Sequence, residues 1–288
     1  MTSLSVMGVG RVGGEVAYLA AVLGLVDTIN LHDTYKPLLE AQIQDLEHTG
    51  LDIRVSRDPG DIHDADVFVF AAGTPRTPDV KTRADLLQAN LPVADICSKY
   101  LRRFDGVLIT ITNPMDANNY YLWKKTGLDR GRCIGSGGML DSARFSGFLR
   151  QRGIDGEGWV LGEHGEHQVP VFSRLTRSVP EQIRDEILGA LRSASMPVIR
   201  GKGGTVFGPA YHTVTLIRTI LEDAGEVYPC SCVLDGEYGV EGCSLGVPAR
   251  IGGQGVEEIL EWELDAWEQR RFREAAAFEQ QLIGQAHE

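Results

Sequence analysis

The stretch Gly8-Val9-Gly10-Arg11-Val12-Gly13-Gly14 decides the fold of this 288-residue chain. It follows a short apolar segment at residues 3–7, and it precedes apolar positions that recur at helical spacing as far as about Gly24. An apolar strand, a glycine-rich turn and a helix in this order are typical of the first unit of a nucleotide-binding sheet. The stretch therefore predicts that the chain begins with a strand–turn–helix unit.

The glycines at positions 8, 10 and 13 form the pattern G-x-G-x-x-G. Gly8 would permit a tight turn, Gly10 would let a pyrophosphate approach the backbone, and Gly13 would let the helix pack closely on the strand. The helix N-terminus, at Arg11 and Val12, would offer free N–H groups and a partial positive charge to the phosphates. Glycine-rich turns are common, but the position of this one between a strand and a helix favours a dinucleotide-binding turn.

An acidic residue supports the same interpretation. Asp33 ends the second expected strand, residues 28–33, and follows Gly13 by 20 residues. A carboxylate at this position accepts hydrogen bonds from a ribose 2′-hydroxyl and repels a 2′-phosphate. The alternative is that Asp33 is only a turn residue. We expect a bound dinucleotide, with NAD as the cofactor in preference to NADP.

Further apolar runs extend this pattern through the first half of the chain. Residues 67–72 and 107–112 are apolar runs of the kind expected for strands that are buried on both faces of a parallel sheet. A strand near 52–55 and the intervening helices complete the alternation. The sequence therefore predicts an α/β fold over residues 1–138, with a doubly wound parallel sheet of the Rossmann type and right-handed crossovers.

Residues 139–288 have a different pattern, which predicts an α+β domain. Helices are expected near 139–152, over 181–201 with a kink at Pro197, and over 210–224. The alternating, glycine-rich residues 227–252 favour antiparallel strands. An amphipathic helix is expected from about Val256 to the end of the chain.

Composition and charge argue against several classes of function. The chain has 43% hydrophobic and 24% charged residues, an ordinary globular composition, and it contains no apolar run long enough for a membrane span. Its net charge of −12 argues against binding to nucleic acid or to an anionic membrane. The N-terminus lacks the basic region of a signal peptide, and the five cysteines lack the paired spacing of a zinc site. We expect a cytoplasmic enzyme with reduced thiols and no metal.

Four further segments carry residues with useful chemistry. In chain order they are residues 73–87 (Gly-Thr-Pro-Arg-Thr-Pro-Asp-Val-Lys-Thr-Arg-Ala-Asp-Leu-Leu), 111–116 (Ile-Thr-Asn-Pro-Met-Asp), 140–145 (Leu-Asp-Ser-Ala-Arg-Phe) and 162–167 (Gly-Glu-His-Gly-Glu-His). In content and order these segments closely resemble the malate and lactate dehydrogenase family. The resemblance extends from Ser5 to the expected C-terminal helix and includes residues 202–205 and 236–239.

The resemblance implies hydride transfer between NAD and a small 2-hydroxy acid. Oxidation of an alcohol to a ketone needs a base for the hydroxyl proton, and a histidine titrates near neutrality. The family pattern makes His164 this base and Asp141 the partner of its other ring nitrogen. Arg144, three residues after Asp141 on one helix face, would grip the substrate's C1 carboxylate with two hydrogen bonds. The alternatives are a helix-face ion pair of Asp141 with Arg144, and His167 as the base.

Other matching positions imply contacts with both ligands. Arg83 would polarise the substrate oxygen as negative charge develops on it, at the end of residues 74–82, which look like a lid that expels water on closing. Asn113, at the carboxyl edge of the sheet, would reach both the substrate and the cofactor. Asn90 and the backbone at Ile111 would border the cofactor. A solvated loop charge is the alternative for Arg83.

Arg76 bears on the identity of the substrate. In the family that the chain resembles, arginine at this position accompanies dicarboxylic substrates, and glutamine accompanies pyruvate. A buried arginine that faced a methyl group would be unpaired, whereas one that faces a carboxylate forms a charge-assisted pair. The resemblance therefore implies malate and oxaloacetate, with an L-lactate dehydrogenase or a broad 2-ketoacid reductase as the alternative. It also implies a homodimer or homotetramer.

The chain departs from the family pattern in its loops. The segment between Arg76 and Arg83 is one residue longer than usual and has Asp79 in place of a glycine, which puts its closed geometry in doubt. Asp141 and His164 are closer in sequence than usual. Two other classes fit less well: an NAD- and metal-dependent glycosidase would need a Cys/His metal pair, and a non-catalytic dinucleotide sensor would have no need of this set of residues.

Overall fold

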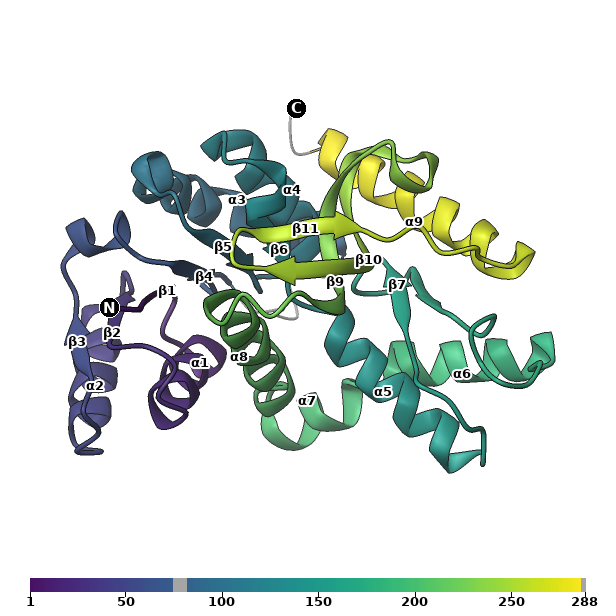
Figure 1. Cartoon of the computed structure of the whole chain (residues 1–288), viewed down its shortest axis with the longest axis horizontal. Coiled ribbons are helices and arrows are strands. Elements are labelled where there is room, and N and C mark those ends of the chain that lie inside the picture. Colours follow the sequence, from purple (N-terminus) through teal and green to yellow (C-terminus); the bar gives the residue numbers. More distant parts are fainter. Residues whose placement is uncertain (75–81, 286–288) are drawn as a thin grey trace.

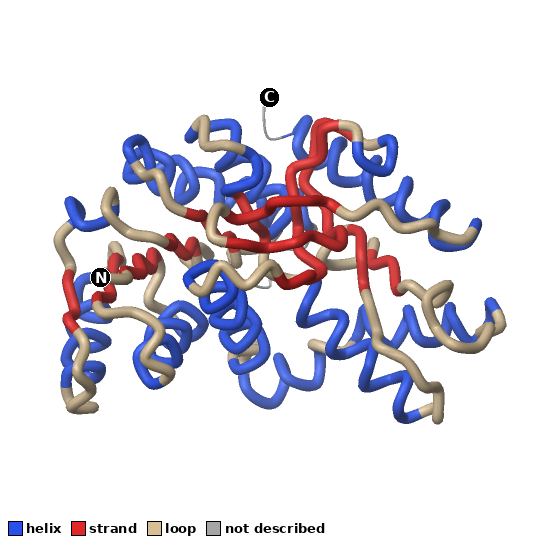
Figure 2. Tube along the Cα trace, viewed as in Figure 1, coloured by secondary structure: helices blue, strands red, loops and turns tan. Residues whose placement is uncertain are grey.

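The computed structural model of the protein describes residues 1–74 and 82–285. A single sheet runs through the centre of the molecule, and helices cover both of its faces (Figure 1). Figure 2 shows the strands as a central layer that continues from the N-terminal half of the chain into the C-terminal half. None of the described helices is both long and apolar enough to cross a membrane.

The first half of the chain forms the parallel part of the sheet. Its strands are β1 (Ser3–Met7), β2 (Thr28–His32), β3 (Arg54–Ser56), β4 (Val67–Phe70), β5 (Val107–Thr110) and β6 (Cys133–Gly135). They alternate with the helices α1 (Arg11–Val22), α2 (Lys36–Glu47), α3 (Arg83–Tyr100) and α4 (Met115–Thr126). The spatial order β3-β2-β1-β4-β5-β6, with every neighbouring pair parallel, confirms the predicted doubly wound sheet. The order of the strands reverses between β1 and β4, and such sheets bind their ligands at this point.

The second half has the predicted α+β character. Its strands are β7 (Val160–Gly162), β8 (Gln168–Pro170), β9 (Glu226–Asp235), β10 (Glu241–Gly252) and β11 (Gly255–Ile259). Its helices are α5 (Gly138–Gln151), α6 (Glu181–Ser193), α7 (Met196–Lys202), α8 (Phe207–Leu221) and α9 (Ala266–Gln285). β9 and β10 pair as a long antiparallel hairpin, and β9 also pairs with β6, where Ile134 faces Cys232. The two halves therefore share one sheet, and α1 packs against α8 between them.

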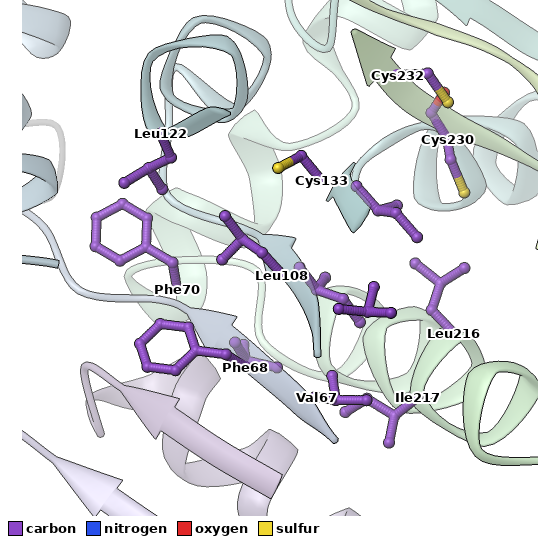
Figure 3. Packing of buried hydrophobic residues seen from close by; sticks show 14 of the residues in the cluster. Val67, Phe68, Phe70, Leu108, Leu122, Cys133, Leu216, Ile217, Cys230 and Cys232 are labelled. Atoms are coloured by element: carbon purple, nitrogen blue, oxygen red, sulfur yellow. The ribbon is translucent and has the colours of Figure 1, made fainter. Parts of the chain in front are cut away.

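Apolar side chains from both halves form one core around the sheet. Phe68 and Phe70 of β4 and Leu108 of β5 are fully buried. Figure 3 shows Val67 of β4 beside Ile217 of α8, with Phe68 and Phe70 pointing away from that helix, in a cluster that also holds cysteines of β6 and β9. Burial on both faces explains why these strands lack a polar alternation. All of the cysteines are free and buried: Cys97, Cys133, Cys230, Cys232 and Cys243.

Two predictions about helices are wrong. The helix expected over residues 181–201 is interrupted, and Pro197 lies in the first turn of α7 instead of kinking a single helix. Proline fits a first turn because that position needs no backbone N–H donor. The last helix begins at Ala266 and not near Val256. The reason is that Gly255, with φ +95°, turns the chain, and Val256 pairs with Ile251 in the β10–β11 hairpin.

Candidate active site

The glycine-rich turn after β1 lies at the carboxyl edge of the parallel strands. Gly8 has φ +91°, and a Cβ atom there would lie 2.3 Å from the backbone of Ala72, which follows β4. A Cβ atom at Gly13 would lie 1.9 Å from the Gly8 carbonyl oxygen, so α1 packs directly on the turn. A Cβ atom at Gly10 would meet nothing within 4 Å. Packing thus requires the first and third glycines, and the second borders open space that a phosphate group could occupy.

Helix α1 begins directly after this turn. Gly10 is its N-cap, and no described side chain caps it. The N–H groups of Arg11 and Val12 in its first turn are therefore available to an anion. The Arg11 side chain extends to the other half of the molecule, where Nη1 donates a hydrogen bond to the Lys202 carbonyl oxygen at 3.2 Å. The side chain of Arg11 thus links the two halves, while its backbone belongs to the helix N-terminus.

Asp33 follows β2, and its carboxylate bonds two backbone groups. Oδ2 accepts from the Val9 N–H at 3.0 Å, and Oδ1 accepts from the Tyr35 N–H at 2.8 Å. The first bond holds the carboxylate against the glycine-rich turn. Each carboxylate oxygen keeps a second lone pair, so partly exposed Asp33 can still accept a ribose hydroxyl. The turn, the uncapped helix and Asp33 form a cradle that fits a dinucleotide such as NAD.

Asn90 connects the loops that follow β4 and β5. It is buried on α3, where its Oδ1 accepts from the Thr74 N–H at 2.7 Å and its Nδ2 donates to the Asn113 carbonyl oxygen at 2.7 Å. Ile111, just after β5, is half-buried, and Asn113 is exposed. Asn90 therefore holds the backbone of both loops at the edge of the sheet where the cradle lies.

His164, Asp141 and Arg144 lie together where α5 passes the loop after β7. His164 Nδ1 is 2.7 Å from Asp141 Oδ2, and Arg144 Nη1 donates to Asp141 Oδ1 at 3.1 Å. Asp141 is fully buried, whereas the His164 side chain is 18% exposed. Gly137, which precedes α5, is required because a Cβ atom there would lie 2.5 Å from the imidazole. The pairing leaves Nε2 as the ring nitrogen that can meet a substrate.

The charges around His164 favour a proton on its ring. Burial alone would lower the pKa of His164, but the Asp141 carboxylate, with a smaller contribution from Asp116, outweighs burial and raises it above its ordinary value. Burial alone would raise the pKa of Asp141, but the His164 ring and the Arg144 guanidinium hold it below its ordinary range. Asp141 is therefore ionised and can stabilise an imidazolium at His164.

Arg83, the first residue of α3, reaches the same loop from the other half of the molecule. Its Nη2 donates to the His164 carbonyl oxygen at 2.7 Å and lies 3.1 Å from Glu163 Oε1. Glycine at position 165 leaves room for this guanidinium, which a Cβ atom there would overlap. The structure thus brings together four residues that the sequence singles out: His164, Asp141, Arg144 and Arg83.

One other predicted position does not join this group, and a second one lies outside the described residues. His167 stacks on Phe278 of α9, with ring centroids 4.4 Å apart, so its ring faces that helix. The partner of Asp141 is thus His164 and not His167. Arg76, with most of the expected lid at residues 74–82, lies outside the described residues.

Sequence reasoning does not identify two acidic residues that hold the loop after β7. Asp116 of α4 is buried and accepts from the His164 N–H at 2.7 Å. Glu163 is buried and accepts from the His167 N–H at 2.8 Å. Asp116 lies in the segment 111–116 and Glu163 in the segment 162–167, near Asn113 and His164. These positions in the sequence are the signal that could have identified them.

A third unpredicted residue is His212 of α8. Burial lowers its pKa, and the charge of Arg144 lowers it further, while Asp141 opposes both. These influences place His212 beside the group around His164, as a neutral histidine at neutral pH. Nothing in the sequence near His212 distinguishes it from other polar residues of an amphipathic helix.

The fold and this group of residues define a class. A doubly wound sheet with a dinucleotide cradle, joined to a half that carries a paired histidine and arginines, is the architecture of two-domain nicotinamide-dependent dehydrogenases. The family model for the lactate/malate dehydrogenase NAD binding domain matches residues 2–135, and that for the alpha/beta C-terminal domain matches residues 139–286. The chain therefore belongs to the lactate/malate dehydrogenase family, and its first half is an NAD-binding domain of that family.

Proteins named malate dehydrogenase and proteins named lactate dehydrogenase are both similar to the chain. Malate dehydrogenase of Halobacterium salinarum is 39% identical, over 96% of both chains. The structure of malate dehydrogenase from Archaeoglobus fulgidus in complex with NADH has a TM-score of 0.90 at 29% identity, covering 100% of both chains. A lactate dehydrogenase from a deep-sea metagenome library has a TM-score of 0.91 at 26% identity, covering 100% of this chain and 99% of that one.

Proposed function

We propose that this protein is an NAD-dependent malate dehydrogenase, which transfers a hydride reversibly between malate and NAD to give oxaloacetate and NADH. The observation that carries the proposal is the grouping of His164, Asp141, Arg144 and Arg83 in one half-buried site. The similarity to a malate dehydrogenase of Halobacterium salinarum and the presence of Arg76 support a dicarboxylic substrate. The alternative is an L-lactate dehydrogenase or a broad 2-ketoacid reductase.

The cradle at the sheet edge would hold the cofactor. The turn at Gly8, Gly10 and Gly13 and the N–H groups of Arg11 and Val12 would bind the pyrophosphate. Asp33 would bind the adenosine ribose and disfavour a 2′-phosphate, which supports NAD over NADP. The positions that would border the nicotinamide end are Asn90, Ile111 and Asn113. When bound, NAD would supply the hydride acceptor for malate oxidation, and NADH the hydride donor for oxaloacetate reduction.

The protein's own residues would handle the proton and the charges. His164 Nε2 takes the hydroxyl proton when malate is oxidised and gives it back when oxaloacetate is reduced. Asp141 holds the Nδ1 proton and stabilises the imidazolium. Because Asp141 bonds only Nη1 of Arg144, the other N–H groups of that guanidinium can grip the C1 carboxylate. Arg83 would stabilise negative charge on the substrate oxygen, and Asn113 would orient the substrate.

Kinetics with two ketoacids test the assignment. Steady-state NADH oxidation should give a kcat/KM for oxaloacetate at least about tenfold above that for pyruvate, since one charge-assisted contact contributes about that much. Arg76→Gln removes this contact, so kcat/KM for oxaloacetate should fall on the order of tenfold to a hundredfold. Turnover of pyruvate should hold or rise, because an unpaired guanidinium no longer opposes closure.

The matched control is Arg102→Gln, at an exposed position after α3. It should leave both kcat/KM values nearly unchanged. A wild-type preference for pyruvate would favour the lactate dehydrogenase alternative. A wild-type preference for oxaloacetate that survives Arg76→Gln would mean that another group binds the second carboxylate.

We also propose that the enzyme is a homodimer or homotetramer. Large apolar side chains are exposed along α7 and the start of α8, and their grouping supports an interface between copies of the chain. They are Met196, Val198, Ile199, Phe207 and Tyr211. Size-exclusion chromatography with light scattering should give at least twice the chain mass of 31.5 kDa. A mass of one chain at micromolar concentration would contradict this proposal.

Two smaller proposals complete the assignment. Residues 1–138 form the cofactor domain and residues 139–288 the substrate domain, a division supported by the end of the parallel strands at Gly135 and the start of α5 at Gly138. The protein works in the cytoplasm, where the free cysteines would stay reduced.

A further inference from the structure

Glu279 is a buried carboxyl group outside the site described above. It lies on α9 and is 0% exposed. In the part of the chain that the structure describes, no group donates a hydrogen bond to either of its carboxyl oxygens. A buried carboxylate without a donor or a cation is strongly destabilising, so this group must be neutral or must have another partner.

Two other buried carboxyl groups face Glu279. One oxygen each of Asp116, Glu163 and Glu279 lie within 4.8 Å of one another, and these three residues are here called the carboxyl cluster. The groups that face Glu279 are Asp116 from α4, Glu163 after β7, Arg83 from α3 and Cys243 from β10, while β8 has no ionisable residue.

The carboxyl cluster cannot carry three negative charges. Arg83 supplies one positive charge, and it contacts Glu163 rather than Glu279. Like charges at this separation in a buried site cannot all ionise, so the cluster keeps at least one proton.

The contacts decide where that proton lies. Asp116 accepts a hydrogen bond from the backbone N–H of His164, which favours its ionised form. Glu163 accepts from the His167 N–H and lies beside the Arg83 guanidinium. Glu279 has no such donor among the described residues. Of the three carboxyl groups, it is therefore the one whose protonation breaks no hydrogen bond or ion pair.

A cation held by the three oxygens is the competing possibility. Calcium would need six to eight oxygen ligands at about 2.3–2.6 Å, and three carboxyl oxygens fall short of that number. The Arg83 guanidinium, 3.1 Å from Glu163, already provides a positive charge and would repel a metal ion. A proton needs no further ligands, and it removes the charge of Glu279.

We propose that Glu279 is a positioning residue, which keeps a proton at neutral pH and thereby lets Asp116 and Glu163 keep their contacts with Arg83 and with the backbone of the loop that carries His164. The link to catalysis rests on the proposed function, whereas the proton on Glu279 does not. Burial and the charges of Asp116 and Glu163 raise the pKa of Glu279 well above its ordinary value, in agreement with a neutral side chain. Burial and Glu163 raise the pKa of Asp116, while the hydrogen bond from the His164 N–H opposes this shift.

Ionisation of Glu279 would weaken two contacts that hold residues of the candidate active site in place. A third negative charge would repel Asp116, whose carboxylate holds the His164 N–H, and Glu163, whose carboxylate pairs with Arg83. Both contacts are on residues of the candidate active site. The catalytic geometry should therefore fail at a pH where Glu279 loses its proton, without any change in a group that touches the substrate.

Thermal unfolding as a function of pH tests the proton on Glu279 directly. An acid with a raised pKa in the folded state destabilises the fold as pH rises above its unfolded pKa, because the folded form then binds more protons than the unfolded form. Glu279→Gln mimics the protonated acid and escapes this loss. We expect both proteins to have nearly the same Tm at pH 5, and the variant to exceed wild type at pH 9 by on the order of 5 °C.

The matched control is Glu274→Gln, the same change at an exposed position of the same helix, which should follow wild type at every pH. A difference between wild type and Glu279→Gln that stays constant with pH would overturn the proposal. So would a rise in the wild-type Tm that is specific to calcium or magnesium at equal ionic strength and is lost in Glu279→Gln. Should the variant fail to fold, the infrared spectrum of wild type decides: absence of a protonated carboxyl band at pH 7 would also overturn the proposal.

The positioning role is tested by malate oxidation at high pH. Malate oxidation needs a neutral His164 ring, so protonation of His164 lowers kcat/KM at acid pH. The decline of kcat/KM at alkaline pH then comes from other groups. In Glu279→Gln this decline should move to higher pH by about one unit, with kcat/KM at pH 7 within about threefold of wild type. An unchanged alkaline decline would remove the link to catalysis. If wild type does not oxidise malate at all, the proposed function fails, and the thermal measurement still decides about the proton.

Discussion

Replacement of His164 by Asn should lower kcat for oxaloacetate reduction by about two orders of magnitude or more, because a positioned acid–base group typically contributes that much. The variant keeps a polar side chain beside Asp141 but loses the ring nitrogen that carries the proton. The dinucleotide cradle lies on other strands, so NADH binding, measured by fluorescence titration, should stay nearly unchanged. The decrease should therefore be in kcat and not in cofactor affinity.

His167→Asn is the matched control for this experiment. His167 is three residues from His164, but its ring stacks on Phe278 and faces α9. We expect its kcat to stay within a few-fold of wild type. If His164→Asn kept most of its turnover and His167→Asn lost it, the roles assigned to the two histidines would have to be exchanged.

Replacement of Asp141 by Asn should have the second large effect, a decrease in kcat/KM of about 10²–10⁴-fold. The buried carboxylate holds Nδ1 of His164 at 2.7 Å and also contacts Arg144 at 3.1 Å. An amide in its place removes the charge that stabilises the imidazolium and leaves Arg144 without its counter-charge. Steady-state kinetics should show a lower kcat together with a higher KM, since both contacts change.

The same variant should shift the pH dependence in a defined direction. Asp141 raises the pKa of His164, so its loss lowers that pKa. Oxaloacetate reduction needs the protonated ring and should therefore decline at a lower pH than in wild type. Malate oxidation needs the neutral ring, so its rise on the acid side should also move to lower pH. Profiles that stay in place, in a variant that folds normally, would mean that His164 is not the titrating group.

The cofactor half could be predicted from the sequence because local physical constraints fix it. Gly8 needs a positive φ, and Gly13 leaves no room for a side chain, so both are visible as glycines. The buried strands are visible as apolar runs for the same reason. The group around His164 could be recognised only through the order of its segments, because its members come from distant parts of the chain and meet through tertiary packing.

The C-terminal segment shows where a periodic pattern is insufficient. Residues 256–259 fit the pattern of an amphipathic helix, but in the structure they pair with β10 as part of a β-hairpin. The start of α9 has a local signal that the periodicity conceals: the Asp265 carboxylate accepts from the N–H groups of Trp267 and Glu268 at 3.0 Å, as helix caps do. Glu279 has no local signal, since a glutamate on a charged helix is normally solvated, and its burial depends on α4 and the loop after β7.

The shared sheet also has a consequence for how the protein folds while it is being synthesised. Ile134 of β6 pairs with Cys232 of β9, a contact across about 100 residues, and contacts of such separation form slowly. During synthesis the cofactor half emerges first, with the outer edge of β6 unpaired until β9 leaves the ribosome. An open edge invites pairing with other chains, but β6 has only three residues, which keeps the exposed edge short.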